Sequence, residues 1–250
     1  MGIFDIFGSK DEREQGALRK LARKVTEKFG PSENRQKVID QLGVMGTPAA
    51  LQTLCLRFTV HAEPGITDQE EKEQALRWLT DAGREAIAPV TAFVREQEAG
   101  VAWGLRALAE VARPEEVVEV VSAELARLAS VYTRDPEKKL TLLAWSAEHH
   151  AGAGDEAMER ALLALLEDFT DDVRIGAARA LAQRPPTEAA REGLLQLLLR
   201  STDNARVRGD VLAALHALGA DVKGHRPSVE PLLVEPWFLD KDGLVKRRGA

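Results

Sequence analysis

The chain has 250 residues, of which 44% are hydrophobic, 5% aromatic and 30% charged, and its formal net charge is −6 at pH 7. Alanine, leucine, glutamate and arginine favour helices, and the few aromatic residues offer little for the core of a sheet. A single cysteine, Cys55, excludes an intramolecular disulfide and a zinc site built from several thiolates. The sequence therefore predicts an all-α protein.

Residues 1–9 form a short apolar segment before the first predicted helix. Ile3, Phe4 and Phe7 are spaced so that one helical turn would place them on a single face. Two interpretations remain open. The segment is either a docking peptide that gives weak peripheral contact with a membrane or a partner, or a cap that folds onto the first repeat.

Two segments further along the chain reveal the unit from which the rest is built. Asp168–Leu181 and Asp203–Leu215 share a Val-Arg pair, and the two pairs begin at Val173 and Val207, thirty-four residues apart. A fixed period of 20–50 residues is typical of solenoids, in which each repeat buries its apolar face against its neighbours.

Six helical hairpins are predicted by following the apolar residue that closes each second helix, here called the anchor. The anchors are Leu42, Leu79, Leu108, Trp145 (or Ala144), Leu181 and Leu215. The first helices are predicted near residues 11–29, 47–61, 84–98, 114–130, 155–168 and 187–201, and the second helices near 32–44, 67–82, 99–111, 135–150, 170–183 and 204–219. Four residues before three anchors stand the small residues Ala75, Gly104 and Ala177, which allow helices to approach closely.

The run Leu42–Leu51 and the two Val-Arg segments resemble HEAT repeats, particularly the short bacterial type also found in proteins related to phycobilisome lyases. The resemblance extends over about residues 30–220. It implies a right-handed α-solenoid of about six hairpins, with a concave groove lined by the second helices. In that family the groove serves mainly to bind other macromolecules. We expect the solenoid to occupy residues 10–222.

Residues 223–250 depart from the repeat and are predicted to form a C-terminal cap with a basic tail. A short helix is expected at 229–234, ending before Pro236. From Trp237 to Lys246, two short apolar runs flank an Asp-Gly turn, a pattern typical of a small hairpin. We expect it to cover the last repeat, the alternative being strand addition to a partner.

The most regular polar signal is a basic column located seven residues before the anchors. On stacked repeats such a column could line one edge of the groove, where it would attract an acidic partner. Alternatively, its members could pair with aspartates between repeats, such as Asp68 and Asp168. The second interpretation is favoured. The column contains Arg35, Lys72, Lys138, Arg174 and Arg208, and further groove candidates on the second helices are Arg77, Arg106 and Arg179.

No combination of residues commits the chain to a reaction. His61-Ala-Glu63 resembles the His-x-Glu of zinc deaminases, but that chemistry needs two further thiolates. The adjacent His149 and His150 would point about 100° apart on a helix, so they do not converge on one ion. Neither a Gly-rich phosphate loop nor a Ser/His/Asp set is present. We expect no metal and no cofactor.

These observations predict a non-enzymatic scaffold or adaptor in the cytoplasm that binds a protein partner through its groove. The alternative is a DNA-binding protein or an enzyme like the HEAT-like alkylpurine DNA glycosylases, which use groove tryptophans beside a catalytic aspartate. Asp81 with Trp78, Trp103 and Trp145 is the nearest match, but these tryptophans fall mostly at core positions. An acidic middle of the chain also disfavours nucleic acid.

Overall fold

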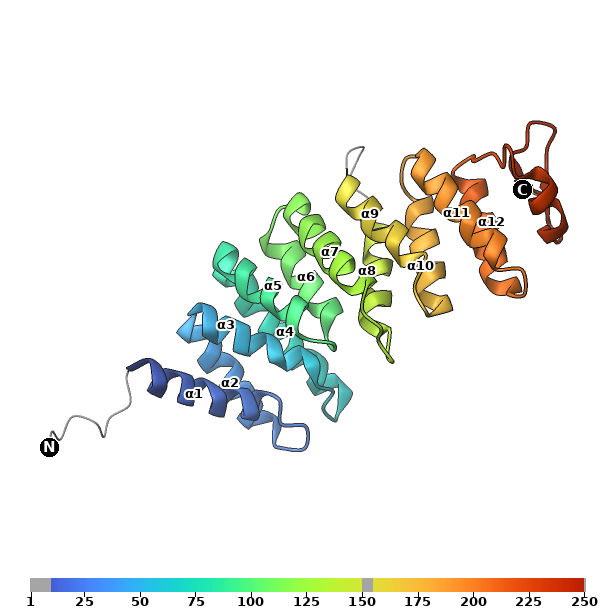
Figure 1. The fold of residues 1–250 in the computed structure, drawn as a ribbon. Coiled ribbons are helices and arrows are strands. Elements are labelled where there is room, and N and C mark those ends of the chain that lie inside the picture. The colour runs from blue at the N-terminus through green and yellow to red at the C-terminus, as the bar shows by residue number, and fades with distance from the viewer. Residues whose placement is uncertain (1–9, 150–154, 250) are drawn as a thin grey trace, which may run out of the picture. The chain divides into compact units, whose positions relative to one another are not determined.

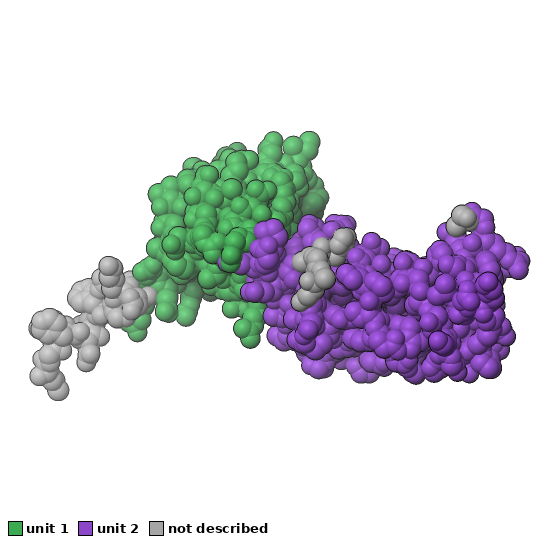
Figure 2. Space-filling view, turned by 90° about the horizontal axis from the view of Figure 1, so that it is seen from above, with its two compact units in different colours: residues 1–113 green, residues 114–250 purple. Residues whose placement is uncertain are grey.

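The computed structural model describes residues 10–149 and 155–249. The apolar residues Ile3, Phe4 and Phe7 and one histidine, His150, lie outside this part of the chain. The protein divides into two compact units, residues 1–113 (unit 1) and residues 114–250 (unit 2) (Figure 2).

The described residues of unit 1 form three helical hairpins, coloured from blue to green in Figure 1. They are α1 (Lys10–Val25) with α2 (Ser32–Met45), α3 (Pro48–Cys55) with α4 (Gly65–Ala82), and α5 (Ile87–Glu96) with α6 (Val101–Val111). The 3₁₀ segment η2 (Leu56–Thr59) lies between α3 and α4, and η3 (Gly83–Ala86) lies between α4 and α5. The first helices α1, α3 and α5 pack on one another in one layer, and the second helices α2, α4 and α6 in another.

Unit 2 contains three further hairpins with the same two-layer arrangement. They are α7 (Pro114–Ala129) with α8 (Glu137–Glu148), α9 (Glu156–Leu165) with α10 (Asp171–Ala182), and α11 (Glu188–Arg200) with α12 (Ala205–Ala217). All six predicted hairpins are therefore present, and the prediction of an all-α, solenoid-like fold is confirmed. In the described residues, no helix combines the length and the apolar character needed to cross a membrane.

Several helices begin at the polar residues that the sequence places between them. Thr47 caps α3 by accepting a hydrogen bond from the N–H of Ala50 at 3.3 Å, and Pro48 follows in the first turn, where its missing N–H costs nothing. Asp155, Thr187 and Asn204 cap their helices in the same way. The hairpin boundaries are thus fixed locally by the sequence.

Five of the six predicted anchors are buried, and the fourth needs a correction. Leu42, Leu79, Leu108, Leu181 and Leu215 are at most 1% exposed. In α8, however, Trp145 is only half-buried and Ala144 is exposed, whereas Ser146 is fully buried. Its hydroxyl donates to the Leu143 carbonyl at 2.8 Å, so a polar residue can occupy this apolar position. The repeat frame in α8 therefore lies one residue later than predicted.

The small residues predicted on the inner faces do allow close helix packing. Ala75 and Ala177 are fully buried. At Gly104 of α6, an added Cβ would lie 2.8 Å from Cγ2 of Val94 and 3.0 Å from Cδ1 of Phe93 in α5. Any larger side chain at this position would push the two helices apart.

The C-terminal residues form the predicted cap on the last hairpin. A short helix α13 (Arg226–Val229) and η4 (Glu230–Leu232) precede the strands β1 (Trp237–Leu239) and β2 (Val245–Arg247). The helix begins three residues earlier than expected. The strands pair antiparallel around a turn in which Gly243 has a φ of 82°. Strand β2 packs on α12, where Val245 is 1% exposed, so the predicted hairpin is confirmed.

Candidate functional site

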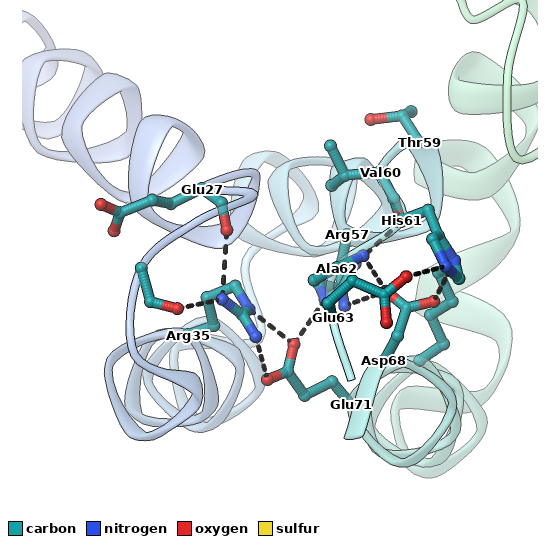
Figure 3. Close-up of polar contacts among 12 residues, drawn as sticks. Glu27, Arg35, Arg57, Thr59, Val60, His61, Ala62, Glu63, Asp68 and Glu71 are labelled. Carbon is teal, nitrogen blue, oxygen red and sulfur yellow. Dashed lines mark hydrogen bonds and ion pairs between the residues drawn. The ribbon is translucent and has the colours of Figure 1, made fainter. Parts of the chain in front are cut away.

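Arg35, the first member of the predicted basic column, is buried in unit 1. Its side chain is 1% exposed and donates two hydrogen bonds to the Glu71 carboxylate, at 2.9 and 3.0 Å. It also donates to the carbonyls of Glu27, at 3.2 Å, and Gly30, at 2.6 Å (Figure 3). Arg35 therefore joins α2 to α4 and holds the turn between α1 and α2.

A second arginine, Arg57 of η2, completes a cluster that sequence reasoning missed. Its side chain is fully buried and donates to Glu71 at 2.8 Å, to Asp68 at 2.5 Å and to the carbonyl of Val60 at 3.0 Å (Figure 3). The five buried side chains of this cluster are called the buried ion network below. They are Arg35, Arg57, Asp68, Glu71 and Lys72.

Asp68 is the carboxylate at the other end of the buried ion network. Burial opposes its ionisation, but hydrogen bonds from Lys72, from the N–H of Ala62 and from Arg57 outweigh this cost and lower its pKa from 3.8 to about 2. His61 lies at the exposed edge, with Nδ1 3.3 Å from Asp68. Lys72, the second member of the column, therefore serves as an internal partner, at 2.7 Å from Asp68.

Unit 2 contains two buried pairs formed by adjacent lysines of α8. Nζ of Lys138 lies 2.7 Å from Glu124 of α7, and both side chains are at most 5% exposed. Nζ of Lys139 lies 2.6 Å from Asp168 and donates to the carbonyl of Val131 at 2.7 Å. With the corrected frame of α8, Lys139 rather than Lys138 is the residue seven positions before the anchor. It occupies the place that Lys72 has in unit 1.

The last two members of the column bind the turns of their own hairpins. Arg174 donates to the carbonyl of Asp168 at 3.1 Å and to the side chain of Asp171. Arg208 donates to the carbonyls of Ser201 and Thr202. Within the described residues, the side chains of the column thus donate hydrogen bonds to carboxylates and to the carbonyls of turns.

The three other candidate arginines are exposed on the second helices. Arg106 of α6 pairs with Glu73 of α4, with its guanidinium 2.7 Å from the carboxylate. Arg179 of α10 pairs with Asp210 of α12 at 2.7 Å. Arg77 of α4 is exposed as well. Their charges remain accessible to solvent, unlike those of Arg35 and Lys72.

The second helices of unit 1 carry a polar and aromatic surface, which is called the tryptophan face below. Nε2 of Gln36 donates to Gln74 at 3.0 Å, and Gln74 donates in turn to Asp40. Nε1 of Trp78 also donates to Asp40, at 3.2 Å. The face consists of Gln36 and Asp40 on α2, Glu73, Gln74 and Trp78 on α4, and Trp103 and Arg106 on α6.

The tryptophans do not fill the core as expected. Trp78, Trp103 and Trp145 are all half-buried on second helices. Trp103 stacks on Phe58, with ring centroids 5.4 Å apart, and the guanidinium of Arg106 lies 5.1 Å from the Trp103 ring. Each ring therefore contacts a neighbouring side chain and remains partly exposed to solvent.

The remaining sequence candidates do not assemble into a reactive centre in the described part of the chain. Asp81 is exposed at the end of α4, and the indole of Trp78 donates to Asp40 instead. His149 stacks on Trp145, with centroids 4.4 Å apart. Among the described residues, no three histidine, cysteine, aspartate or glutamate side chains are placed to hold a metal ion.

The comparison with protein families agrees with the repeat architecture. Residues 159–249 match the model of the HEAT repeats, so the predicted HEAT-like helical repeat is confirmed. No curated protein matches the sequence. Similar solved structures include a designed armadillo repeat protein in complex with the peptide (KR)4. The designed protein is 22% identical to this chain, the match covers 84% of this chain and 95% of the designed one, and the TM-score is 0.42. An engineered protein is 19% identical, with 81% and 96% covered and a TM-score of 0.39.

Proposed function

We propose that this protein is a non-enzymatic scaffold or adaptor of the cytoplasm that binds a protein partner through the tryptophan face of unit 1. The observation that supports the proposal is the placement of Trp78 and Trp103 on neighbouring second helices, half-buried and surrounded by hydrogen-bonding side chains. Tryptophan and arginine are the residues that contribute most often to binding energy at protein interfaces.

The charge of the second helices of unit 1, which carry this face, favours a partner segment that contains lysine or arginine. Arg35 and Lys72 are buried in ion pairs, so their positive charges are not available to a partner. The exposed and half-buried carboxylates of α2, α4 and α6 outnumber the exposed cations. The carboxylates are Glu33, Asp40, Glu70, Glu73, Asp81 and Glu110, and the cations are Lys37, Arg77 and Arg106. Complementary charge raises both the association rate and the specificity.

The buried ion network fixes two of the helices that carry this surface, α2 and α4, to each other. It links α2, η2 and α4 through hydrogen bonds of 2.5–3.0 Å. A surface that is already rigid loses little conformational entropy on binding, which favours affinity.

The test is an affinity purification of the tagged full-length protein from its native cells, with charge-reversed variants. Glu70→Lys with Asp81→Lys changes exposed carboxylates of α4, and Glu115→Lys with Glu119→Lys makes the same change of charge on exposed residues of α7. We expect one protein to be recovered in stoichiometric amount with the wild type and the α7 variant, and to be lost with the α4 variant. Recovery with all three would contradict the proposed face. Release of alkylated bases by the purified protein, abolished in Asp81→Asn, would support the glycosylase alternative instead.

A further inference from the structure

Unit 1 contains a groove on the side of its first helices, away from the tryptophan face. Its volume is about 410 Å³, and α1, α3, η2, α5 and the following Gln97 line it. Leu18, Leu56 and Phe93 contribute apolar atoms, whereas Arg19 of α1 and Glu96 of α5 contribute charged groups. Nε2 of Gln52 donates to Glu96 at 3.0 Å.

The size and composition of the groove suit a short apolar peptide. Binding pockets of about 300–1,000 Å³ with apolar walls and a few polar groups accept ligands of that kind. Ala22 and Ala49, where larger side chains would fill the space, also line it. An apolar side chain that enters the groove would be stabilised by removal of its surface from water.

We propose that the groove binds residues 1–9 of the same chain, which lie outside the described residues. This segment contains Ile3, Phe4 and Phe7, and its one charged residue, Asp5, has the sign that Arg19 requires. The proposal selects one of the two interpretations of this segment, the intramolecular one.

The distances allow this contact. Leu18 follows Lys10 by eight residues, which is about 12 Å along a helix. A segment of nine residues reaches roughly 30 Å when extended. Tethering also gives the segment an effective concentration on the order of millimolar, so weak affinity is enough for occupancy. A partner or a membrane that takes up the same apolar side chains would have to displace the segment from the groove.

Disulfide formation in the full-length chain tests the proposal and leaves Ile3, Phe4 and Phe7 intact. Gly2→Cys is combined with Gln15→Cys at the groove or, as a control, with Glu14→Cys, which is exposed one residue earlier and does not line it, so that Arg19 is retained in both pairs. Because Cys55 is fully buried and burial raises the pKa of its thiol, it does not compete.

We expect the groove pair to close an intramolecular disulfide about tenfold faster than the control pair in oxidised glutathione, because docking raises the local concentration of one thiol near the other. Adding Phe4→Ser and Phe7→Ser should remove this difference. Equal rates for the two pairs, or a difference that survives the serine substitutions, would overturn the proposal. Disulfide-linked dimers whose formation rises with protein concentration would show instead that the groove binds the segment of a second copy.

Discussion

Glu71 of α4 accepts two parallel hydrogen bonds from Arg35 of α2, at 2.9 and 3.0 Å, and both side chains are at most 2% exposed. Such a bidentate pair is stronger and more directional than a single charged hydrogen bond. Because Arg35 belongs to the first hairpin and Glu71 to the second, this pair connects the first two hairpins of unit 1, and Arg57 of η2 donates to the same carboxylate.

Replacing Glu71 should therefore destabilise the protein strongly. Glu71→Gln removes the charge that compensates two buried arginines, and breaking a buried pair in this way costs about 3–5 kcal/mol. Urea unfolding at pH 7 measures the loss. Glu73→Gln, two residues along the same helix, breaks the more exposed pair with Arg106 and should cost less than about 1 kcal/mol. Equal losses in the two variants would contradict the structural role given to Glu71.

Acid should weaken unit 1 through Asp68. Its folded pKa of about 2 is below the usual 3.8, so its contribution to stability is complete above about pH 4 and is lost as the pH falls through about 2. A shift of that size corresponds to roughly 2–3 kcal/mol. Urea unfolding of unit 1 followed between pH 6 and pH 2 measures it.

The control for this pH dependence is Asp68→Asn, which retains the size of the side chain but does not ionise. It should be less stable than the wild type at pH 6, because Arg57 and Lys72 lose their partner. Its stability should also vary less between pH 4 and pH 2. If the two proteins lost stability in parallel over this range, another carboxylate would be responsible.

Gly43 of α2 allows the indole of Trp78 to lie against the helix. An added Cβ would be 2.1 Å from Cδ2 of Trp78. We expect Gly43→Ala to displace the ring and to cost about 1–3 kcal/mol, as overpacking does. Gly209 in α12 has no atom within 4 Å of an added Cβ, so Gly209→Ala should stabilise its helix by about 0.5–1 kcal/mol. Melting temperatures that move in the same direction would show that Trp78 is not held in this way.

The hairpins could be predicted because their signals are local. Leucine spacing defines each second helix, and residues such as Thr47 and Asn204 begin helices by contacts within three residues. The frame of α8 could not be predicted, because Ser146 looks like a surface residue in the sequence. Only the contact between its hydroxyl and the carbonyl of Leu143 explains its burial.

The buried ion network was the least predictable part of the site. The basic column includes Arg35 and Lys72, and aspartates were expected to pair with such a column. Arg57, however, falls in the predicted first helix 47–61, to which the pattern gave no polar role; in the structure it lies in η2, from where it donates to Glu71. Contacts of this kind depend on how hairpins stack, which a period in the sequence does not encode.

The C-terminal hairpin should contribute to the stability of unit 2. Val245 of β2 is 1% exposed, and the carbonyl of Val245 accepts a hydrogen bond from Nδ1 of His216 in α12 at 3.0 Å. The ring of Trp237 lies 5.7 Å from His216, edge to face. A chain ending at Pro236 would expose this side of α12 to water.

We expect this truncation to cost at least the roughly 1.5–3 kcal/mol that burial of Val245 alone contributes. In a chain of this length, each kcal/mol lowers the melting temperature by about 2–4 °C, so a decrease of at least about 3–12 °C should be seen by circular dichroism. Arg248→Ala removes an exposed ion pair with Glu235 and a cation–π contact with Phe238 at 5.8 Å, and it serves as the control, with little change expected. An unchanged melting curve for the truncated chain would mean that the hairpin is an appendage free to pair with a partner, because the loss of a packed cap must expose α12.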